Sequence, residues 1–505
     1  MTPAEDDDRP PRQGTRVVVM ALLAMVLVVA STATALAAGV LLQVDDFKPK
    51  AHEVLPDIPE VAEAKPGKPR TILLLGSDAR YADAKAGVRP RSDTILLVRV
   101  DPQTQVISAM SIPRDLKAEI PGHGSDKINA AYEMGGPRLT VRTIRKLFED
   151  ATGDPFPINN VVNVDFRGFR RAVDYIGGVY VDVDRDYFND VTGPGGYAAI
   201  DIDPGYQKLE GQDALDYVRY RHTDNDFIRA ARQQSFLRQA RGQRGVRRLV
   251  SIGDTGKLMR VFRRYFTVDK SFRSTKQIFR MAKLALYLVM GDPSVQQVRF
   301  RADYAPDAAL DTRLYASTDQ LRATLRQFLG ARPASKPAPA PAQTRTPRTR
   351  ERAKPAAAPG LVDARSQGVD QAVLAEPKLR FPVYFPRLRL AQGSYAEAGP
   401  RTYTIRDEKG DRHRAYRLVL STGTDGEYYG IQGMTWTDPP ILDDPDETRT
   451  IAGRRLQLYR DGRAIRLVAF KTRRAVYWVS NTLTSSLTNR QMLATAQSLT
   501  RLDRG

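Results

Sequence analysis

Residues 217–234 concentrate charged side chains whose types and spacing suit the binding of a phosphate anion. Arg219 and Arg221 alternate with tyrosines, so an extended segment would project both guanidinium groups from one face. Three further residues are three and four positions apart and would share one face of a helix: Arg229, Arg232 and Gln233. Such a strand–turn–helix unit would aim several planar, permanently charged groups at one doubly charged anion. A mixture of Arg and Asp is also typical of an ion-paired surface, and this stretch alone does not separate the two interpretations.

Two aspartates stand at the ends of predicted strands and suggest a metal site. Asp78 follows the apolar run 71–75, and Asp93 opens the run 94–100. If these strands are neighbours, the two carboxylates meet at one end of the sheet, where open α/β sheets bind their ligands. Two carboxylates, substrate phosphates and water form a usual environment for Mg²⁺. The chain has no cysteine, so no Cys/His cluster points to zinc. Turn and helix-capping roles are the alternative for both aspartates.

More polar groups follow the next elements. Residues 111–115 add Arg114 after a third strand, and residues 127–132 add Lys127 and Asn129 in a loop that opens a helix. Cationic groups that recur after successive strands favour a shared anion site over chance surface charge.

The elements that would position these groups alternate between strands and helices. Apolar runs predict strands at 71–75, 94–100, 106–112, 161–164 and 179–183, and helical periodicity predicts helices at 139–148 and 166–176. This alternation predicts an α/β sheet domain over residues 70–330.

The N-terminal region predicts a membrane anchor. Residues 17–42 carry no charge and, as a helix rising about 1.5 Å per residue, would reach about 39 Å, enough to span the roughly 30 Å hydrocarbon core with some tilt. Three arginines among residues 1–16 predict a cytoplasmic N-terminal tail, which places everything after residue 43 outside. A cleaved signal peptide, cut near Ala37, is the alternative. The net charge of +20 would suggest nucleic acid for a cytoplasmic protein, but this topology disfavours it.

Two low-complexity segments separate the predicted units. Residues 43–69 read as a stalk, and residues 331–375 as a Pro/Ala/Arg-rich linker that cannot build a core. Residues 376–505 predict a separate α+β domain, with strands at 456–459, 465–470 and 476–479 and a capping box at Thr488 and Gln491 that opens a final helix with Leu499 and Leu502 on its apolar side. Its aromatic residues could line a glycan-binding face, although aromatics in strands are more often core residues: Trp436, Tyr459, Tyr477 and Trp478.

Taken together, these motifs resemble the LytR-CpsA-Psr family over about residues 70–330. The motifs occur in the family's order: Gly76-x-Asp78-x-Arg80, Arg91-Ser-Asp93-Thr94, Ser111-Ile-Pro-Arg114-Asp115, Lys127-Ile-Asn129-Ala-Ala-Tyr132, Val164-Asp165-Phe166-x-Gly168-Phe169, Ile176-Gly-Gly-Val179 and Arg219-x-Arg221-His-x-Asp224-x-Asp226. The resemblance implies an α/β/α sandwich around a mixed sheet, with a hydrophobic tunnel for a polyprenyl chain. It also implies transfer of a glycopolymer from a polyprenyl pyrophosphate carrier to peptidoglycan by a membrane-anchored, extracytoplasmic bacterial enzyme.

The resemblance also assigns roles to individual residues. Asp78 and Asp93 would hold Mg²⁺, for which Mn²⁺ is an alternative. The residues around the reacting pyrophosphate would be Arg91, Arg114, Arg219, Arg221, Asp224 and Arg229, and the further substrate-binding residues would be Arg80, Lys127, Asn129, Arg232 and Gln233. Asp224 would act as a base or position an arginine, while Asp226 and Arg232 could be struts for their neighbours.

This sequence departs from the family pattern in a longer loop at 81–90 and in Leu209-Glu-Gly211, where Leu-Asp-Gly is more familiar. Neither change removes a charge that the mechanism needs. Two other functions stay open: hydrolysis of a polyprenyl pyrophosphate at the same site, and a non-enzymatic wall-binding or regulatory role carried by the C-terminal domain.

Overall fold

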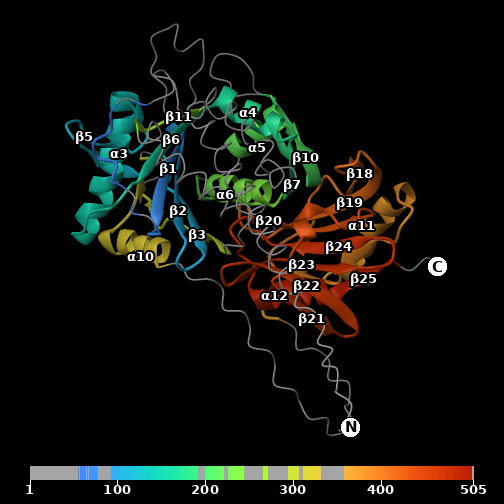
Figure 1. The fold of residues 1–505 in the computed structure, drawn as a ribbon. Helices are drawn as coiled ribbons and strands as arrows, with labels where there is room; N and C mark the ends of the chain where they lie inside the picture. The colour runs from blue at the N-terminus through green and yellow to red at the C-terminus, as the bar shows by residue number, and fades with distance from the viewer. Residues whose placement is uncertain are drawn as a thin grey trace, which may run out of the picture.

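The computed structural model describes residues 55, 57–63, 65, 67–77, 92–190, 199–220, 226–243, 266–270, 294–305, 311–330 and 358–502. These residues form an α/β unit up to residue 330 and a β-rich unit from residue 358 (Figure 1). Within the described ranges, no helix is long and apolar enough to cross a membrane. The apolar segment 17–42 lies outside them, so the predicted anchor stays a prediction.

A six-stranded mixed sheet forms the centre of the α/β unit. Its strands are β1 (Arg70–Ser77), β2 (Ser92–Asp101), β3 (Val106–Ser111), β6 (Asn160–Asp165), β11 (Phe266–Val268) and β12 (Ser294–Val298). They are ordered β11-β6-β1-β2-β3-β12, with β1 antiparallel to β2 and parallel to β6. The strands predicted at 71–75, 94–100, 106–112 and 161–164 are confirmed, with ends that shift by at most two residues.

Helices cover both faces of this sheet (Figure 1). Helices α3 (Ala130–Thr152) and α10 (Thr318–Leu329) pack on one face, where Leu73 and Leu75 belong to their core. Helices α4 (Phe166–Tyr175), α5 (Gly211–Arg219) and α6 (Asp226–Gly242) lie on the other face, above Leu74. Side chains alternate between the two faces of a strand, which explains why consecutive leucines of β1 enter different layers.

Short strand pairs complete this unit. They are β4 (Lys117–Ile120) with β5 (Gly124–Lys127), β7 (Val179–Val183) with β10 (Gly205–Leu209), β8 (Tyr187–Asn189) with β9 (Ile200–Ile202), and β13 (Asp303–Tyr304) with β14 (Leu314–Tyr315). The strand predicted at 179–183 is therefore correct, but it belongs to the β7–β10 pair and not to the central sheet.

An antiparallel seven-stranded sheet forms the C-terminal unit, in the order β18-β19-β20-β24-β23-β22-β21. Its strands are β18 (Arg401–Arg406), β19 (Arg412–Ser421), β20 (Tyr428–Met434), β21 (Glu447–Ile451), β22 (Arg454–Asp461), β23 (Ala464–Lys471) and β24 (Val476–Ser480). Around it lie β15 (Leu361–Asp363) with β17 (Leu388–Leu390), β16 (Tyr384–Pro386) with β25 (Leu499–Arg501), α11 (Arg365–Ala375), α12 (Asn489–Ser498), η4 (Glu376–Lys378) and η5 (Pro440–Leu442).

Two C-terminal expectations need correction. Residues 361–375, predicted as linker, form β15 and α11, because Ala372 and Ala375 bury a small apolar face against the domain core. The final helix opens with the predicted capping box of Thr488 and Gln491, but it ends at Ser498, and Leu499 begins strand β25.

The stalk prediction also changes. Leu55 and Ile58 are buried in the core of the α/β unit, and the Leu55 N–H donates to the carbonyl of Val268 at 2.8 Å. This part of the predicted stalk is therefore packed against the α/β unit, because burial of its apolar side chains stabilises the packed arrangement.

Each unit has a core of its own, and a further hydrophobic cluster joins the two units, so they are not separate. Tyr180 of β7 and Tyr206 of β10 pack against Trp436 and Trp478 of the C-terminal unit. Both tryptophans are at least 97 % buried, at 3 % and 0 % exposure, so they cannot form an open glycan-binding face. The core interpretation of the C-terminal aromatics is confirmed, because Tyr459 and Tyr477 are buried as well.

Candidate functional site

The polar ends of three strands meet at one edge of the central sheet. Ser77, the last residue of β1, pairs with Ser92 of β2 on one side and with Asp165 of β6 on the other. Asp93 follows Ser92 directly, and Asp78 follows Ser77 in the sequence. The neighbouring strands on which the paired-carboxylate prediction depended are thus confirmed, while Asp78 itself lies outside the described residues.

A mostly apolar pocket of about 130 Å³ opens at this edge. Its apolar wall comes from β1, β2, β6 and the three helices above them: Leu74, Leu75, Leu96, Val164, Phe166, Phe169, Leu215, Val218, Phe236 and Leu237. Its polar groups are Asp93, Thr94, Asp165, Arg219, Arg229 and Gln233. The pocket therefore combines an apolar interior with a small set of charged and hydrogen-bonding groups.

Arg219 reaches the pocket from the end of a helix. It is the last residue of α5, so the extended segment predicted around Arg219 and Arg221 is wrong at this position. The helix forms because Ala214, Leu215 and Tyr217 turn a buried face toward the domain. The Arg219 guanidinium lies over the Phe166 ring at 4.6 Å.

Asp216 lies one turn before Arg219 and steadies it electrostatically. The shortest distance from the Arg219 guanidinium to the Asp216 carboxylate, from Nη1 to Oδ1, is 4.0 Å. Burial raises the pKa of Asp216, although the hydrogen bond from Gln212 and the charge of Arg219 both act to lower it. Arg219 is thus held between an aromatic face and a carboxylate, with its side chain 16 % exposed.

Helix α6 supplies Arg229 and Gln233 from one face. The helix predicted for this stretch is confirmed, and these two residues, four apart, both line the pocket. Arg229 is 5 % exposed. The Gln233 amide donates to the Thr94 hydroxyl and to the Val218 carbonyl, each at 3.1 Å. Gln233 thereby ties α6 to β2 and α5 at the pocket wall.

Arg232 is not among the residues that line the pocket, and its position agrees with the alternative role, a strut for its neighbours. It is fully buried, and its Nη1 donates to the carbonyls of Tyr217 at 2.9 Å and Tyr220 at 3.1 Å. Its guanidinium also lies over the Tyr187 ring at 4.7 Å. Because it holds the last turn of α5, Arg232 positions Arg219 and does not face the pocket.

The predicted residues after β3 form a charge chain beside the pocket. Arg114 Nη1 is 2.6 Å from the Asp93 carboxylate, and its Nε is 3.4 Å from Asp115. Lys127 binds Asp115 at 2.8 Å, and the Asn129 N–H donates to the Arg114 carbonyl at 3.2 Å. Arg114 thus contacts a pocket residue directly, whereas Lys127 and Asn129 support the loop and are not among the lining residues.

Five predicted site residues lie outside the described ranges: Asp78, Arg80, Arg91, Arg221 and Asp224. The visible edge carries the carboxylates of Asp93 and Asp165, which are the oxygen ligands that Mg²⁺ prefers, so the residues present fit the predicted ion. No group of three or more acidic or histidine side chains that could hold a metal occurs in the described part of the chain.

Asp165, Thr94 and Phe166 belong to the pocket but were not selected as site residues from the sequence. Asp165 ends β6 and caps α4, where its carboxylate accepts from the Gly168 N–H at 2.6 Å. It satisfies the same strand-end rule that selected Asp93, and that rule could have found it. Nothing in the local sequence indicates that Phe166 lies beneath Arg219.

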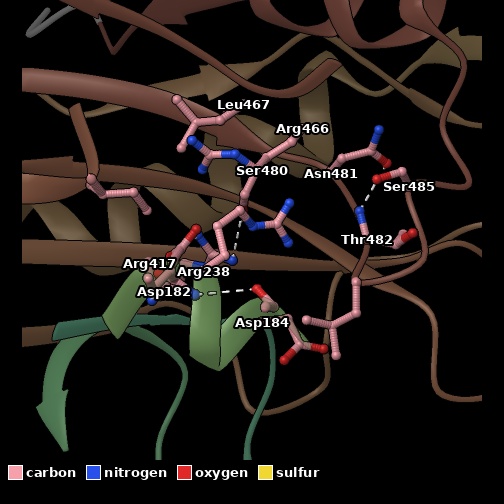
Figure 2. Close-up of a pocket in the computed structure, with 14 residues that line it drawn as sticks. Asp182, Asp184, Arg238, Arg417, Arg466, Leu467, Ser480, Asn481, Thr482 and Ser485 are labelled. Atoms are coloured by element: carbon pink, nitrogen blue, oxygen red, sulfur yellow. Dashed lines mark hydrogen bonds and ion pairs between the residues drawn. The ribbon is translucent and has the colours of Figure 1, made fainter. Parts of the chain in front are cut away.

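A second, polar cluster stands at the junction of the two units (Figure 2). Arg417 is fully buried, with Nη1 3.0 Å from the Asp182 carboxylate and Nη2 2.9 Å from the Ser480 hydroxyl. Burial next to Arg238 lowers the pKa of Arg466 to about 10. The cavity among these residues measures about 40 Å³, which suits one or two waters and excludes a substrate.

The LytR_cpsA_psr family model matches residues 42–324, which is more than half of the chain. The chain belongs to the LytR-CpsA-Psr family. The family predicted from the motifs is therefore confirmed, and the C-terminal unit lies beyond the matched range.

Several relatives of this chain carry the name of a transferase. Over 225 residues it is 32 % identical to TagT of Bacillus subtilis, a polyisoprenyl-teichoic acid–peptidoglycan teichoic acid transferase, with 44 % of this chain and 67 % of TagT covered. It is 36 % identical over 177 residues to TagU of Oceanobacillus iheyensis, with 34 % and 49 % covered. A solved structure of TagT bound to LIIa-WTA matches with a TM-score of 0.39 and 24 % identity over 55 % of this chain and 97 % of that one. The prediction of an enzyme is confirmed by these named transferases.

Proposed function

We propose that this chain transfers a glycopolymer from a polyprenyl pyrophosphate carrier to peptidoglycan at the outer face of a bacterial membrane. One observation carries the proposal: an apolar pocket whose charged groups, Arg219, Arg229 and Asp93, lie at one strand edge. A lipid-linked pyrophosphate has the matching division into a long apolar tail and a doubly charged head. The named activities of TagT and TagU support the same assignment.

Different residues of the site bind different parts of the carrier. The apolar wall binds the polyprenyl chain and excludes water, which strengthens electrostatic interactions in the site. Arg219 and Arg229 bind the pyrophosphate oxygens, and Gln233 fixes the geometry of α6 against β2. Phosphoryl transfer needs little covalent help from protein, so positioning and charge neutralisation supply most of the acceleration.

In the proposed reaction, a sugar hydroxyl of peptidoglycan attacks the phosphorus that bears the polymer. A new P–O bond forms, the bond to the bridging oxygen breaks, polyprenyl phosphate leaves, and the hydroxyl proton passes to solvent. Mg²⁺ bound at Asp93 and Asp78, or Mn²⁺ in its place, would neutralise charge on the pyrophosphate. Arg114 holds the Asp93 carboxylate at 2.6 Å and so orients the visible half of that site.

We place the anchor at residues 17–42, with the catalytic unit outside the membrane. The lack of charge over these residues supports the span, and the upstream arginines support the orientation. Protease accessibility of residues after 43 in intact cells with permeabilised controls tests the orientation.

A transfer assay tests the proposed function. The purified full-length protein receives a synthetic polyprenyl pyrophosphate-linked saccharide and peptidoglycan, and acceptor-bound saccharide and polyprenyl phosphate are measured. We expect Arg219→Ala and Arg229→Ala to lower kcat about 100-fold or more, because each removes a charged donor at the developing charge. The matched control Arg171→Ala, on the exposed side of α4, keeps activity. Release of polyprenyl phosphate at the same rate without acceptor would instead identify a hydrolase.

A further inference from the structure

A large cleft lies on the opposite side of α6 from the apolar pocket. It measures about 1170 Å³ and runs between the α/β unit and the C-terminal unit. Arg229 and Gln233 line the pocket, whereas the next residues in each case, Ala230 and Gln234, line the cleft. Single ligand sites usually measure roughly 300–1,000 Å³, so this cleft has room for an extended ligand.

The inner end of the cleft adjoins the candidate active site. Ser111 and Pro113 line it, and Arg114, which binds Asp93 at 2.6 Å, follows Pro113 directly. Gln234 donates from Nε2 to the Ser111 hydroxyl at 3.2 Å, which fixes α6 against β3 at this end. A ligand in the cleft would therefore bring one end close to the groups that surround the pyrophosphate.

The C-terminal unit builds the far wall, and this wall is held in place. Asp461, the last residue of β22 before the turn to β23, accepts from Arg238 Nη1 at 2.6 Å and from the Gln297 N–H at 3.1 Å. Asp461, at the base of this turn, is thereby pinned to α6 and β12, while Arg463 of the same turn lies exposed on the cleft wall. The cleft is consequently a fixed feature of the two-unit structure.

The lining has the chemistry of a site for an anionic glycan. The exposed amide of Gln327 can bind sugar hydroxyls, and the Phe227 ring supports the exposed Arg299, whose guanidinium lies 5.5 Å from the ring centre. The carboxylate that lines the cleft, Asp461, is already bound by Arg238. Arginines that face the cleft therefore favour a ligand with carboxylates of its own. A lipid chain would bring no negative charge to the exposed Arg299 and Arg463.

We propose that this cleft binds the acceptor, a glycan strand that carries carboxylates on its peptide or lactyl substituents, and that the C-terminal unit supplies one wall of the acceptor site. This inference rests on the proposed function, because the hydroxyl that attacks must approach the pyrophosphate from outside the lipid pocket. It assigns a role to a unit that lies beyond the family match.

Acceptor kinetics test the inference with the full-length protein. The probe is a soluble peptidoglycan glycan strand with stem peptides, and the variants are Arg299→Ala, Arg463→Ala and the cleft-filling Gln327→Trp. All three positions are exposed, so the fold is retained. We expect the acceptor KM to rise about tenfold in each variant, with kcat at saturating acceptor and the donor KM unchanged. Arg412→Ala, an exposed position in β19 that does not line the cleft, is the matched control.

The outcomes separate this inference from the proposed function. Wild-type transfer with an unchanged acceptor KM in all three variants overturns the acceptor site and leaves the function intact. Absence of transfer by the wild type overturns the function, and equilibrium binding of the same glycan strand without donor then decides the cleft. We expect binding to weaken about tenfold in the variants and also when the strand's carboxylates are amidated. Equal binding by all proteins, or equal competition by a single-stranded oligonucleotide of matched charge, overturns the assignment.

Discussion

The buried ion pair between Arg417 and Asp182 predicts a large and measurable coupling between the two units. Arg417 is 0 % exposed, its Nη1 is 3.0 Å from the Asp182 carboxylate, and the Trp478 indole N–H donates to the other Asp182 oxygen at 3.3 Å. Gly430 leaves the space that the guanidinium fills, since a side chain there would collide with it. Arg417→Met keeps most of the volume but strands the Asp182 carboxylate in a buried junction.

The expected loss follows from that stranded charge. Removing one partner of a buried pair costs about 3–5 kcal/mol, because the remaining charge stays desolvated. For a urea dependence of about 2–3 kcal/mol per molar, the unfolding midpoint falls by about 1–2.5 M. Asp182→Asn should cost a similar amount for the same reason. The double variant should cost much less than the sum of the two single losses, because it leaves neither charge alone.

Intrinsic fluorescence reports this transition directly. The chain has two tryptophans, Trp436 and Trp478, and both are buried in the core that the two units share. Urea unfolding of the full-length protein, followed by tryptophan emission, therefore measures the junction itself. The exposed substitution Arg473→Met, in the turn between β23 and β24, is the control. A loss below about 1 kcal/mol for Arg417→Met, or strictly additive losses in the double variant, would refute the reasoning.

Three further predictions concern the site and its supports. Arg232→Met should destabilise the protein more at about pH 7.5 than at about pH 5, because burial raises the pKa of Asp184 and loss of Arg232, which acts to lower it, raises that pKa further. The free-energy cost of the buried carboxylate is absent below the pKa of Asp184 in the unfolded chain and grows as the pH rises toward its pKa in the folded protein. Thermal unfolding at both pH values measures the difference, and equal losses of stability would contradict this prediction. Phe166→Leu removes the aromatic ring beneath the Arg219 guanidinium, and with it a cation–π interaction of about 0.5–2 kcal/mol. We expect kcat to fall several-fold without a matching change in the unfolding midpoint. An unchanged kcat in the transfer assay would contradict this prediction. Leu237→Trp should narrow the pocket and raise the donor KM more for long polyprenyl chains than for short ones; a KM change independent of chain length contradicts it.

The parts of the site that were predictable depend on local patterns. The runs that became β1, β2 and β3 are apolar on both faces, and Asp93 lies at a strand end, so sequence rules found them. The spacing of Arg229 and Gln233 placed both on one helix face, which the structure confirms.

The parts that were missed depend on tertiary contacts. Arg232 has the same local spacing as its neighbours, yet its guanidinium packs against Tyr187 of β8 and against Tyr217 and Tyr220 at the end of α5, away from the pocket. Arg219 lies in helix α5 and not in the predicted extended segment, because the buried face of this helix packs on the domain core, which a short alternation of Tyr and Arg does not show.

The packing of the α/β unit against the C-terminal unit could not be predicted from the sequence either. Tyr180 and Tyr206 lie in β7 and β10, two short strands that pair with each other, and both side chains pack into the hydrophobic cluster shared with the C-terminal unit. Contacts between segments more than two hundred residues apart, such as the Tyr180 hydroxyl with the Arg406 carbonyl at 2.9 Å, leave no trace in local periodicity.

The most direct test of the central claim is a crystal structure of the protein soaked with a polyprenyl pyrophosphate and Mg²⁺. We expect a pyrophosphate within hydrogen-bond distance of Arg219 and Arg229, a metal ion on Asp93, and a lipid chain that enters the pocket past Phe166. A pyrophosphate bound outside this strand edge, with the apolar pocket empty, would contradict the account.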